Sequence, residues 1–459
     1  MGSITLPTEA WAESQFGECD FGDVRRTRRA VRLAAQIAND SSGSTPRQTV
    51  VWSECKAAYR LIDREEVTFN AISQPHWRRT RAQTLGHWLL LGDTTECDFG
   101  VKRRVKGLGP TGNNGGLGFM LHSSLMVSAD SEELVGLAAQ ELFYRRNRDK
   151  SESRHERMKR KRESEVWGRV IDAVGAAPEN VRFTHVLDRG ADNFEVYCHL
   201  ASNKVDFVVR AAQLHRKLKT PEGEQVKLCD YLQSLKVLGS YELPVRARTG
   251  EAARKAVIEV RFGPLLVPAP IHQSAWTKQF GIKAVACWVI ECREANPPPG
   301  ATPVNWVLYT SHQTETFEDA MRIIGYYEKR WLIEEYHKSL KTGCQLEARQ
   351  YETSERLEAI AGFLSIVAVR LLQLKSVARN EPSRPAKDLL PRHWIEVLQT
   401  LRKRPRQTWT VRQFFRELAG LGGFLGRKGD GEPGWITIWR GFDKLVPALA
   451  YAENRHRCG

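Results

Sequence analysis

Two short apolar segments, each followed within two residues by an aspartate, constrain the fold of this chain more than any other feature. The run Trp88–Leu91 stops at Asp93, and Val181–Leu187 is followed directly by Asp188. Short apolar runs bounded by polar residues are typical of buried strands. If the two strands are adjacent and parallel, they end at the same sheet edge, and their carboxylates meet there. An aspartate at a strand end is also often only a cap or turn residue, so both interpretations are open at this point.

The order of the expected elements favours an α/β protein built on a mixed sheet. Between residues 87 and 211 the elements follow one another as strand, strand, strand, helix, strand, helix, strand, an order that suits a mixed sheet. Residues 212–310 are strand-rich and are predicted to form an inserted β subdomain. We therefore expect a helical domain over residues 1–70, an α/β domain over 71–375 that contains the insertion, and a helical domain over 376–459.

The N-terminal region carries a strongly basic helix. Asp23 is a good N-cap for a helix that bears Arg25, Arg26 and Arg29 near its start. A second helix is expected over residues 52–64. A helix pair with arginines on one face can bind a nucleic-acid duplex, although a basic face can also be merely solvated.

The charge of the whole chain agrees with a polyanionic partner. The 459 residues contain 69 Lys and Arg against 54 Asp and Glu, a net charge of +15. A foldable protein with this excess usually binds nucleic acid, although charge alone does not separate DNA, RNA and a membrane surface. Nine scattered cysteines without a C-x-x-C pair indicate reduced thiols rather than disulfides or a zinc site. The N-terminus does not resemble a signal peptide and no run of about 20 apolar residues occurs, so a cytoplasmic protein without a membrane partner is expected.

A second cluster of charged residues is predicted on a helix over residues 326–341. Its members are spaced 3, 4, 4 and 3 residues apart, which places them along one stripe of a helix: Tyr327, Arg330, Glu334, Lys338 and Lys341. One carboxylate is thus flanked by three cations and a phenol. Exposed helices with Glu and Lys four residues apart are common, so the stripe alone does not prove a site.

The joint pattern of three carboxylates points to phosphodiester chemistry. Asp93, Asp188 and Glu334 would repel one another at one sheet edge unless hard divalent cations such as Mg²⁺ or Mn²⁺ bound between them. Two such ions can assist both the attacking and the leaving oxygen of a phosphoryl transfer. The flanking cations would then hold the neighbouring phosphates.

The same residues carry a resemblance to a known family. Tyr327-(2)-Arg330-(3)-Glu334-(6)-Lys341 resembles the Y-(2)-R-(3)-E-(6)-K signature of the DDE transposases of the insertion-sequence-four family. The segments Leu91–Thr95 and Val186–Asp192 resemble the motifs that hold its first and second aspartates. The similarity extends over nearly the whole chain, from residue 21 to residue 445.

The resemblance implies a fold and a set of site residues. It implies an RNase H-like catalytic core with a β-strand insertion, in which Asp93, Asp188 and Glu334 bind two Mg²⁺ ions per active site, with Mn²⁺ as a substitute. It also implies DNA contacts by two groups of residues. The first group lies around the triad: Tyr327, Arg330, Lys338, Lys341, Arg210 and Trp306, the last as a stacking partner for a flipped base. The second lies in the N-terminal domain: Arg25, Arg26, Arg29, Tyr59 and Arg60.

By the same resemblance, the activity would be cut-and-paste transposition of bacterial DNA. The C-terminal domain would form a homodimer that brings together two inverted-repeat ends, cleaves them through a hairpin intermediate, and joins the 3′-hydroxyl to target DNA. Such a protein would act in the cytoplasm, on the nucleoid. Two alternatives remain open on the sequence: a DNA-binding inhibitor of transposition without catalysis, and a metal-dependent nuclease that cleaves but does not join.

Overall fold

The computed structural model describes residues 8–101, 105–112, 115–131, 133–145, 153, 162–245 and 251–434, with parts of 437–451. Within these residues, twelve strands form one mixed sheet, with the strand order β2-β3-β1-β5-β6-β12-β11-β10-β7-β8, with β4 on β3 and β9 on β10. The strands are β1 (Gly86–Asp98), β2 (Gly109–Thr111), β3 (Gly116–Ser128), β4 (Leu134–Phe143), β5 (Val181–Leu187), β6 (Asp206–Arg210), β7 (Lys217–Lys219), β8 (Gln225–Lys227), β9 (Gly239–Val245), β10 (Arg254–Pro268), β11 (Ala284–Glu294) and β12 (Asn305–Thr310). The predicted mixed α/β core is therefore confirmed.

The sheet is buried on both faces, as its apolar strands require. Leu89 and Leu91 of β1 belong to one hydrophobic cluster, whereas Leu90, which points to the other face, belongs to a second. The second cluster is completed by α7 (Glu165–Val174) and α8 (Phe194–Ser202). Because both faces need cover, the strands read as continuous apolar runs rather than as alternating ones.

The parallel pairing of the central strands is the feature that positions the site. β1 runs parallel to β5 with Leu91 opposite Val186, and β5 runs parallel to β6 with Leu187 opposite Val209. One detail differs from the sequence prediction, because β1 does not end at Asp93. It continues to Asp98 alongside the antiparallel β3 after its pairing with β5 has stopped at Leu91.

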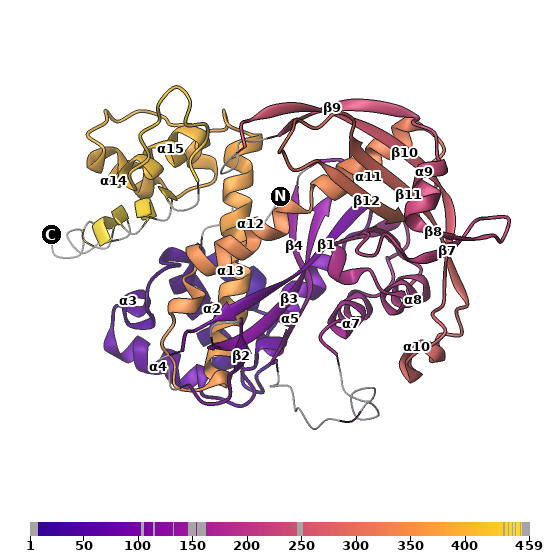
Figure 1. Cartoon of the computed structure of the whole chain (residues 1–459). Helices are drawn as coiled ribbons and strands as arrows, with labels where there is room; N and C mark the ends of the chain where they lie inside the picture. The colour runs from indigo at the N-terminus through magenta and orange to yellow at the C-terminus, as the bar shows by residue number, and fades with distance from the viewer. Residues whose placement is uncertain are drawn as a thin grey trace.

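The strand-rich insertion extends the same sheet instead of forming a separate one. β12 pairs antiparallel with both β6 and β11, which joins the core to β10, β7 and β8. Two short helices, α9 (Leu228–Ser234) and α10 (Ala275–Gln279), accompany these strands. Figure 1 shows them beyond the core, on the side away from the N-terminal helices.

Helices precede the sheet, as the sequence predicts. They are α1 (Thr8–Phe16), α2 (Val24–Asn39), α3 (Thr45–Thr49), α4 (Trp52–Ile62) and α5 (Phe69–Arg81). The side chain of Asp23 caps α2 by accepting a hydrogen bond from the Arg25 backbone N–H. The predicted domain boundary after residue 70 falls at the start of α5, which packs against both α1 and β4.

The helix predicted over residues 326–341 is interrupted, which corrects the sequence prediction of one continuous stripe. α11 (Phe317–Glu328) ends before α12 (Trp331–Lys338), and Ser339–Gly343 forms a single π-helical turn, η2. At the break, the Lys329 ammonium donates to the backbone carbonyls of Ser128, Ala129 and Ser131. The side chain of Lys329 thus ties the break between the two helices to the β3–β4 turn, about 200 residues earlier in the chain.

A long buried helix, α13 (Ser354–Asn380), connects the parts of the molecule. It contacts α2, α4, α5, β4, α12 and α15. Figure 1 shows α2–α4 and the C-terminal helices α14 (Arg392–Leu401) and α15 (Val411–Leu421) near opposite ends of it. It is long and apolar enough to cross a membrane, but 89% of its apolar window is buried in the protein, as in a core helix. The predicted boundary after residue 375 lies within this helix.

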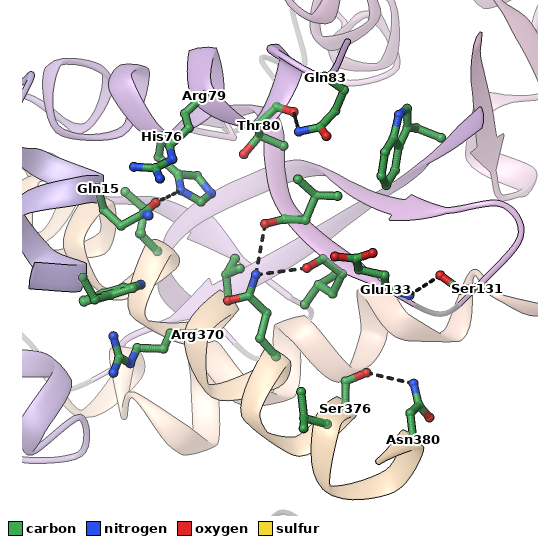
Figure 2. A pocket seen from close by; sticks show the side chains of 18 of the residues that line it. Gln15, His76, Arg79, Thr80, Gln83, Ser131, Glu133, Arg370, Ser376 and Asn380 are labelled. Atoms are coloured by element: carbon green, nitrogen blue, oxygen red, sulfur yellow. Dashed lines mark hydrogen bonds between the residues drawn. The ribbon is translucent and has the colours of Figure 1, made fainter. Parts of the chain in front are cut away.

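A cavity of about 440 Å³ opens between α1, α5, the β3–β4 turn and α13. Figure 2 shows Gln15, hydrogen-bonded to His76, on one side of it and Arg370 of α13 on another. None of the residues that the sequence assigns to the active site lines this cavity.

Candidate active site and DNA-binding surface

Three candidate residues lie side by side because of the strand register. Continued by two residues from Leu91 and Val186, the β1–β5 register places Asp93 opposite Asp188. Continued by one residue from Leu187 and Val209, the β5–β6 register places Asp188 opposite Arg210. Neighbouring strands lie about 4.8 Å apart, and residues opposite each other on parallel strands point to the same face. The structure therefore places these three residues in a row at the ends of neighbouring strands. The Asp188 charge is close enough to raise the pKa of Asp93, and the Arg210 guanidinium donates to the Asn305 carbonyl at 3.4 Å.

Helix α12 brings the third carboxylate to this row. Arg330, the residue that precedes α12, lies 3.6 Å from Asp93 through its Nη1 and 2.5 Å from the Glu334 carboxylate through its Nη2. The Arg330 side chain is only 17% exposed. A cation thus links the carboxylate of the sheet to that of the helix, although Asp93 and Glu334 are 241 residues apart.

The electrostatics of Asp93 reflect this crowding. Burial and the nearby charges of Asp188 and Glu334 together raise the pKa of Asp93 to about 6, against the opposing effects of Arg330 and the Thr94 backbone N–H. At neutral pH the Asp93 carboxylate is nevertheless ionised, as a cation ligand must be.

The donor set fits a hard divalent cation by its chemistry. Asp93, Asp188 and Glu334 offer only carboxylate oxygens, the ligands that Mg²⁺ and Mn²⁺ prefer. Among the described residues, no three Asp, Glu, His or Cys side chains lie close enough to one another to hold a metal ion. Arg330 lies between two of the three carboxylates, so it must move for all three to bind one cluster of cations.

The structure separates Glu334 from its neighbour Glu335. Glu335 accepts from Lys375 of α13 at 2.7 Å and from Lys338 at 3.1 Å, and its side chain is only 13% exposed. Glu334 faces Arg330 instead and is about half exposed. The selection of Glu334 as the site carboxylate remains a prediction.

The other predicted contacts around the triad are placed as follows. Trp306 of β12 packs edge-on against Tyr327 of α11, with ring centroids 5.9 Å apart. Lys341, in the π turn, pairs with Glu347 at 3.0 Å, while Lys338 is 59% exposed. Tyr327 is close enough to influence the pKa of Arg330, whereas both lysines have acidic partners, Glu335 for Lys338 and Glu347 for Lys341.

The predicted N-terminal contacts differ in their accessibility. Arg25 is 85% exposed, and Arg60 is also exposed. Arg26 binds Glu66 and the Phe21 carbonyl. Arg29 is 15% exposed and binds both the Glu54 carboxylate and its backbone carbonyl, which joins α2 to α4.

Tyr59 is half-buried, and its ring packs against that of Tyr351. The contacts of Arg29 with Glu54 and of Tyr59 with Tyr351 favour a structural role for Arg29 and Tyr59. The predicted DNA contacts of both residues remain predictions.

Arg25 and Arg29 give a matched pair of tests. We expect Arg25→Gln to reduce the slope of log K against log salt by roughly one unit, because one phosphate contact is lost. Arg29→Gln should leave that slope unchanged and lower the melting temperature, since Glu54 loses its buried partner. Fluorescence anisotropy over a salt series and thermal denaturation measure the two effects. An equal loss of slope in both variants would contradict the structural part assigned to Arg29.

Several supporting residues were not predicted from the sequence. Trp167 of α7 lies under both aspartate motifs: a Cβ on Gly92 or Gly190 would meet its ring at 3.2 and 3.1 Å. His122 of β3 packs on that ring at 4.4 Å between centroids and hydrogen-bonds Thr94 at 2.7 Å. Gly92, next to Asp93 in β1, was the available signal, because a glycine in a strand often marks close packing.

Asp192, the second aspartate of the motif around Asp188, has a different environment. Its side chain is fully buried and pairs with Arg216. It also accepts hydrogen bonds from the Tyr197 hydroxyl at 2.9 Å and from the Ala212 backbone N–H at 2.7 Å. These contacts fasten the loop after β5 to the loop after β6, so Asp192 belongs to the framework of the site.

Three family models match the chain in succession. A transposase DNA-binding model matches residues 8–67, a transposase DDE domain matches residues 159–370, and a transposase Tn5 dimerisation domain matches residues 366–456. The DDE match includes Asp188 and Glu334 but begins after Asp93, whose place beside them rests on the strand register.

The fold and these matches define a metal-dependent DNA nuclease and strand transferase that binds DNA and dimerises. The chain belongs to the Tn5-like DDE transposases, and the insertion-sequence-four family is consistent with this assignment.

Proposed function

We propose that this transposase moves its element by a cut-and-paste route. A homodimer would pair two inverted-repeat ends, cleave both, and join each 3′-hydroxyl to target DNA, in the cytoplasm and on the nucleoid. The observation that carries the proposal is the row of Asp93, Asp188 and Arg210 across three strands, with Glu334 of α12 linked to it through Arg330.

The proposed division of the chain follows the elements. Residues 1–70 would bind the transposon end, residues 71–375 would carry the chemistry, and residues 376–459 would dimerise. The three family matches support this order, and the two proposed boundaries lie at the start of α5 and within α13.

In the proposed mechanism, Asp93, Asp188 and Glu334 would hold two Mg²⁺ ions, or Mn²⁺ in their place. When bound, these ions supply electrostatic assistance to the attacking and leaving oxygens of each phosphoryl transfer. Arg210 and Lys338 would hold phosphates on either side of the scissile bond. Arg330 would leave the carboxylates and contact a phosphate as well, which lets cations and DNA enter the site together. Tyr327 and Lys341 would support these contacts.

The hairpin step is assigned to Trp306. A hairpin on the transposon end requires an unstacked base at its tip, and an aromatic ring can stack on that base. Trp306 is only partly buried and packs edge-on against Tyr327, which leaves ring surface for such a partner.

We expect Trp306→Ala to slow hairpin formation by about tenfold or more, since base stacking contributes about 1–3 kcal/mol. Nicking of the first strand should change little. Denaturing gels of end-labelled duplex resolve both products. Equal losses in the two steps would refute the stacking role, and Trp276→Ala, in an exposed tryptophan of the insertion, serves as the control.

The raised pKa of Asp93 predicts how metal binding depends on pH. Protons and cations compete for this carboxylate, so Mn²⁺ binding should weaken as the pH falls through about 6. Below that value the apparent dissociation constant should rise by up to about tenfold per pH unit. Electron paramagnetic resonance of free Mn²⁺ measures this dissociation constant between pH 5 and 8. A midpoint near pH 4, the ordinary range of carboxylates, would contradict the shift.

One assay separates the proposal from its two alternatives. The full-length protein is incubated with Mg²⁺, labelled DNA of the two element ends and a supercoiled target. Joined products support a transposase, cleavage without joining supports a nuclease, and binding alone supports an inhibitor of transposition. The intact triad of Asp93, Asp188 and Glu334 argues against the last outcome, binding without catalysis.

A further inference from the structure

His337, a residue of α12 that the sequence did not single out, lies against the first aspartate of the site. Its Nδ1 is 3.9 Å from Asp93 Oδ2. It follows Glu334 by three residues, so both side chains lie on neighbouring positions of one helix face. Asp93 Oδ2 therefore has two neighbours from α12 and its start: the Arg330 guanidinium at 3.6 Å and the His337 ring at 3.9 Å.

The imidazole of His337 is buried with one nitrogen unused. The side chain is 10% exposed, and its Nε2 has no hydrogen-bond partner among the residues that the structure describes. A buried polar atom without a partner costs about 1–3 kcal/mol. The neutral ring carries a single N–H. In the tautomer that carries its proton on Nδ1, the N–H points toward Asp93. The buried atom left without a partner is then Nε2, which in this tautomer is only an acceptor.

We propose that His337 is a positioning residue for Asp93. Its Nδ1–H donates to Asp93 Oδ2 once Arg330 has moved away, and so orients the carboxylate toward the divalent cation. The inference rests on the proposed function of Asp93 as a cation ligand. Carboxylates that bind metal are commonly hydrogen-bonded by neighbours in this way, and loss of such a neighbour typically lowers metal affinity by about 10–100-fold.

The geometry explains why Asp93 needs this donor. Its Oδ1 already accepts from the Thr94 backbone N–H at 2.8 Å, whereas the described contacts of Oδ2 are those with Arg330 and His337. If Arg330 turns to a DNA phosphate, Oδ2 loses its cation. A shift of about 1 Å then brings the imidazole to hydrogen-bond distance, and the carboxylate keeps a fixed orientation.

The shapes of asparagine and glutamine allow a sharp test. The amide nitrogen of asparagine can occupy the position of Nδ1, while that of glutamine reaches the position of Nε2. His337→Asn should therefore bind Mn²⁺ within about threefold of the wild type. His337→Gln and His337→Leu should bind it about 10–100-fold more weakly. The readout is the Mn²⁺ dissociation constant of the full-length protein by electron paramagnetic resonance.

His185 of β5 supplies the matched control. It is 2% exposed, and within the described part of the chain its Nε2 also has no hydrogen-bond partner, but it has no described contact with a carboxylate of the site. His185→Asn and His185→Gln should leave Mn²⁺ affinity unchanged. Thermal denaturation in the absence of metal checks that each variant is folded. If His337→Leu does not fold, the comparison of Mn²⁺ affinity between the polar variants His337→Asn and His337→Gln still tests the proposal.

Three outcomes would overturn the proposal. The first is equal Mn²⁺ affinity in the asparagine and glutamine variants at position 337. The second is an equal loss in the His185 variants. The third is a directly coordinated ¹⁴N signal in electron spin-echo spectra, which would make His337 a ligand. Failure of the proposed function looks different, because Asp93→Asn and Glu334→Gln would then also leave Mn²⁺ binding intact.

Discussion

The Glu334→Gln variant is expected to cleave transposon-end DNA at least about a thousandfold more slowly than the wild type while it still binds that DNA. The substitution keeps the size of the side chain but replaces a charged ligand oxygen with an amide. Loss of several kcal/mol of transition-state stabilisation corresponds to a factor of this size. Single-turnover cleavage in Mg²⁺ measures the rate, and a gel-shift assay without metal measures binding.

Glu335→Gln is the control for this variant. Glu335 differs from Glu334 by one position, but its carboxylate binds Lys375 of α13 and Lys338. The Glu335 variant should cleave within a few-fold of the wild-type rate and should melt at a lower temperature. If Glu334→Gln retained full cleavage, the assignment of Glu334 to the triad would be wrong.

Asp192→Ala is expected to give the largest loss of stability. It removes the buried partner of Arg216 together with the acceptor of the Tyr197 hydroxyl and the Ala212 N–H. Breaking a buried ion pair by removal of one partner costs about 3–5 kcal/mol, because the remaining charge is left without compensation. Urea denaturation should show that decrease in the free energy of unfolding.

Asp188→Ala, a substitution four residues earlier, should instead remove activity and leave most of the stability. The Asp188 carboxylate accepts a hydrogen bond from the Gly190 N–H at 2.7 Å in an exposed turn. Its loss should cost only about 1 kcal/mol of stability but should abolish cleavage. If both variants lost stability equally, the division of this motif into one catalytic and one framework aspartate would be wrong.

The elements that sequence reasoning placed correctly are those set by local patterns. Asp23 was expected to cap a helix and does so, and the apolar runs before Asp93 and Asp188 form the central strands. The sequence argument assumed that these two strands are parallel neighbours, and the structure shows that they are. Local propensity and strand composition were sufficient for these features.

The features that were missed depend on distant contacts. The break between α11 and α12 is held by Lys329 on carbonyls of the β3–β4 turn, so the local periodicity of 326–341 still indicated one helix. The burial of Arg29 depends on Glu54 of another helix. His337 is buried and lies 3.9 Å from Asp93, which is 244 positions earlier. No local pattern encodes these pairs.

The continuity of α13 bears on how such proteins can evolve and be engineered. The DDE match ends at residue 370 and the dimerisation match begins at residue 366, so the two modules meet inside a helix whose buried residues continue to Val377. A chimera joined at that seam would combine two halves of one core helix, each shaped for different neighbours. Exchange of dimerisation modules between relatives should therefore succeed more often when the crossover lies beyond Asn380, with the entire helix inherited from one parent.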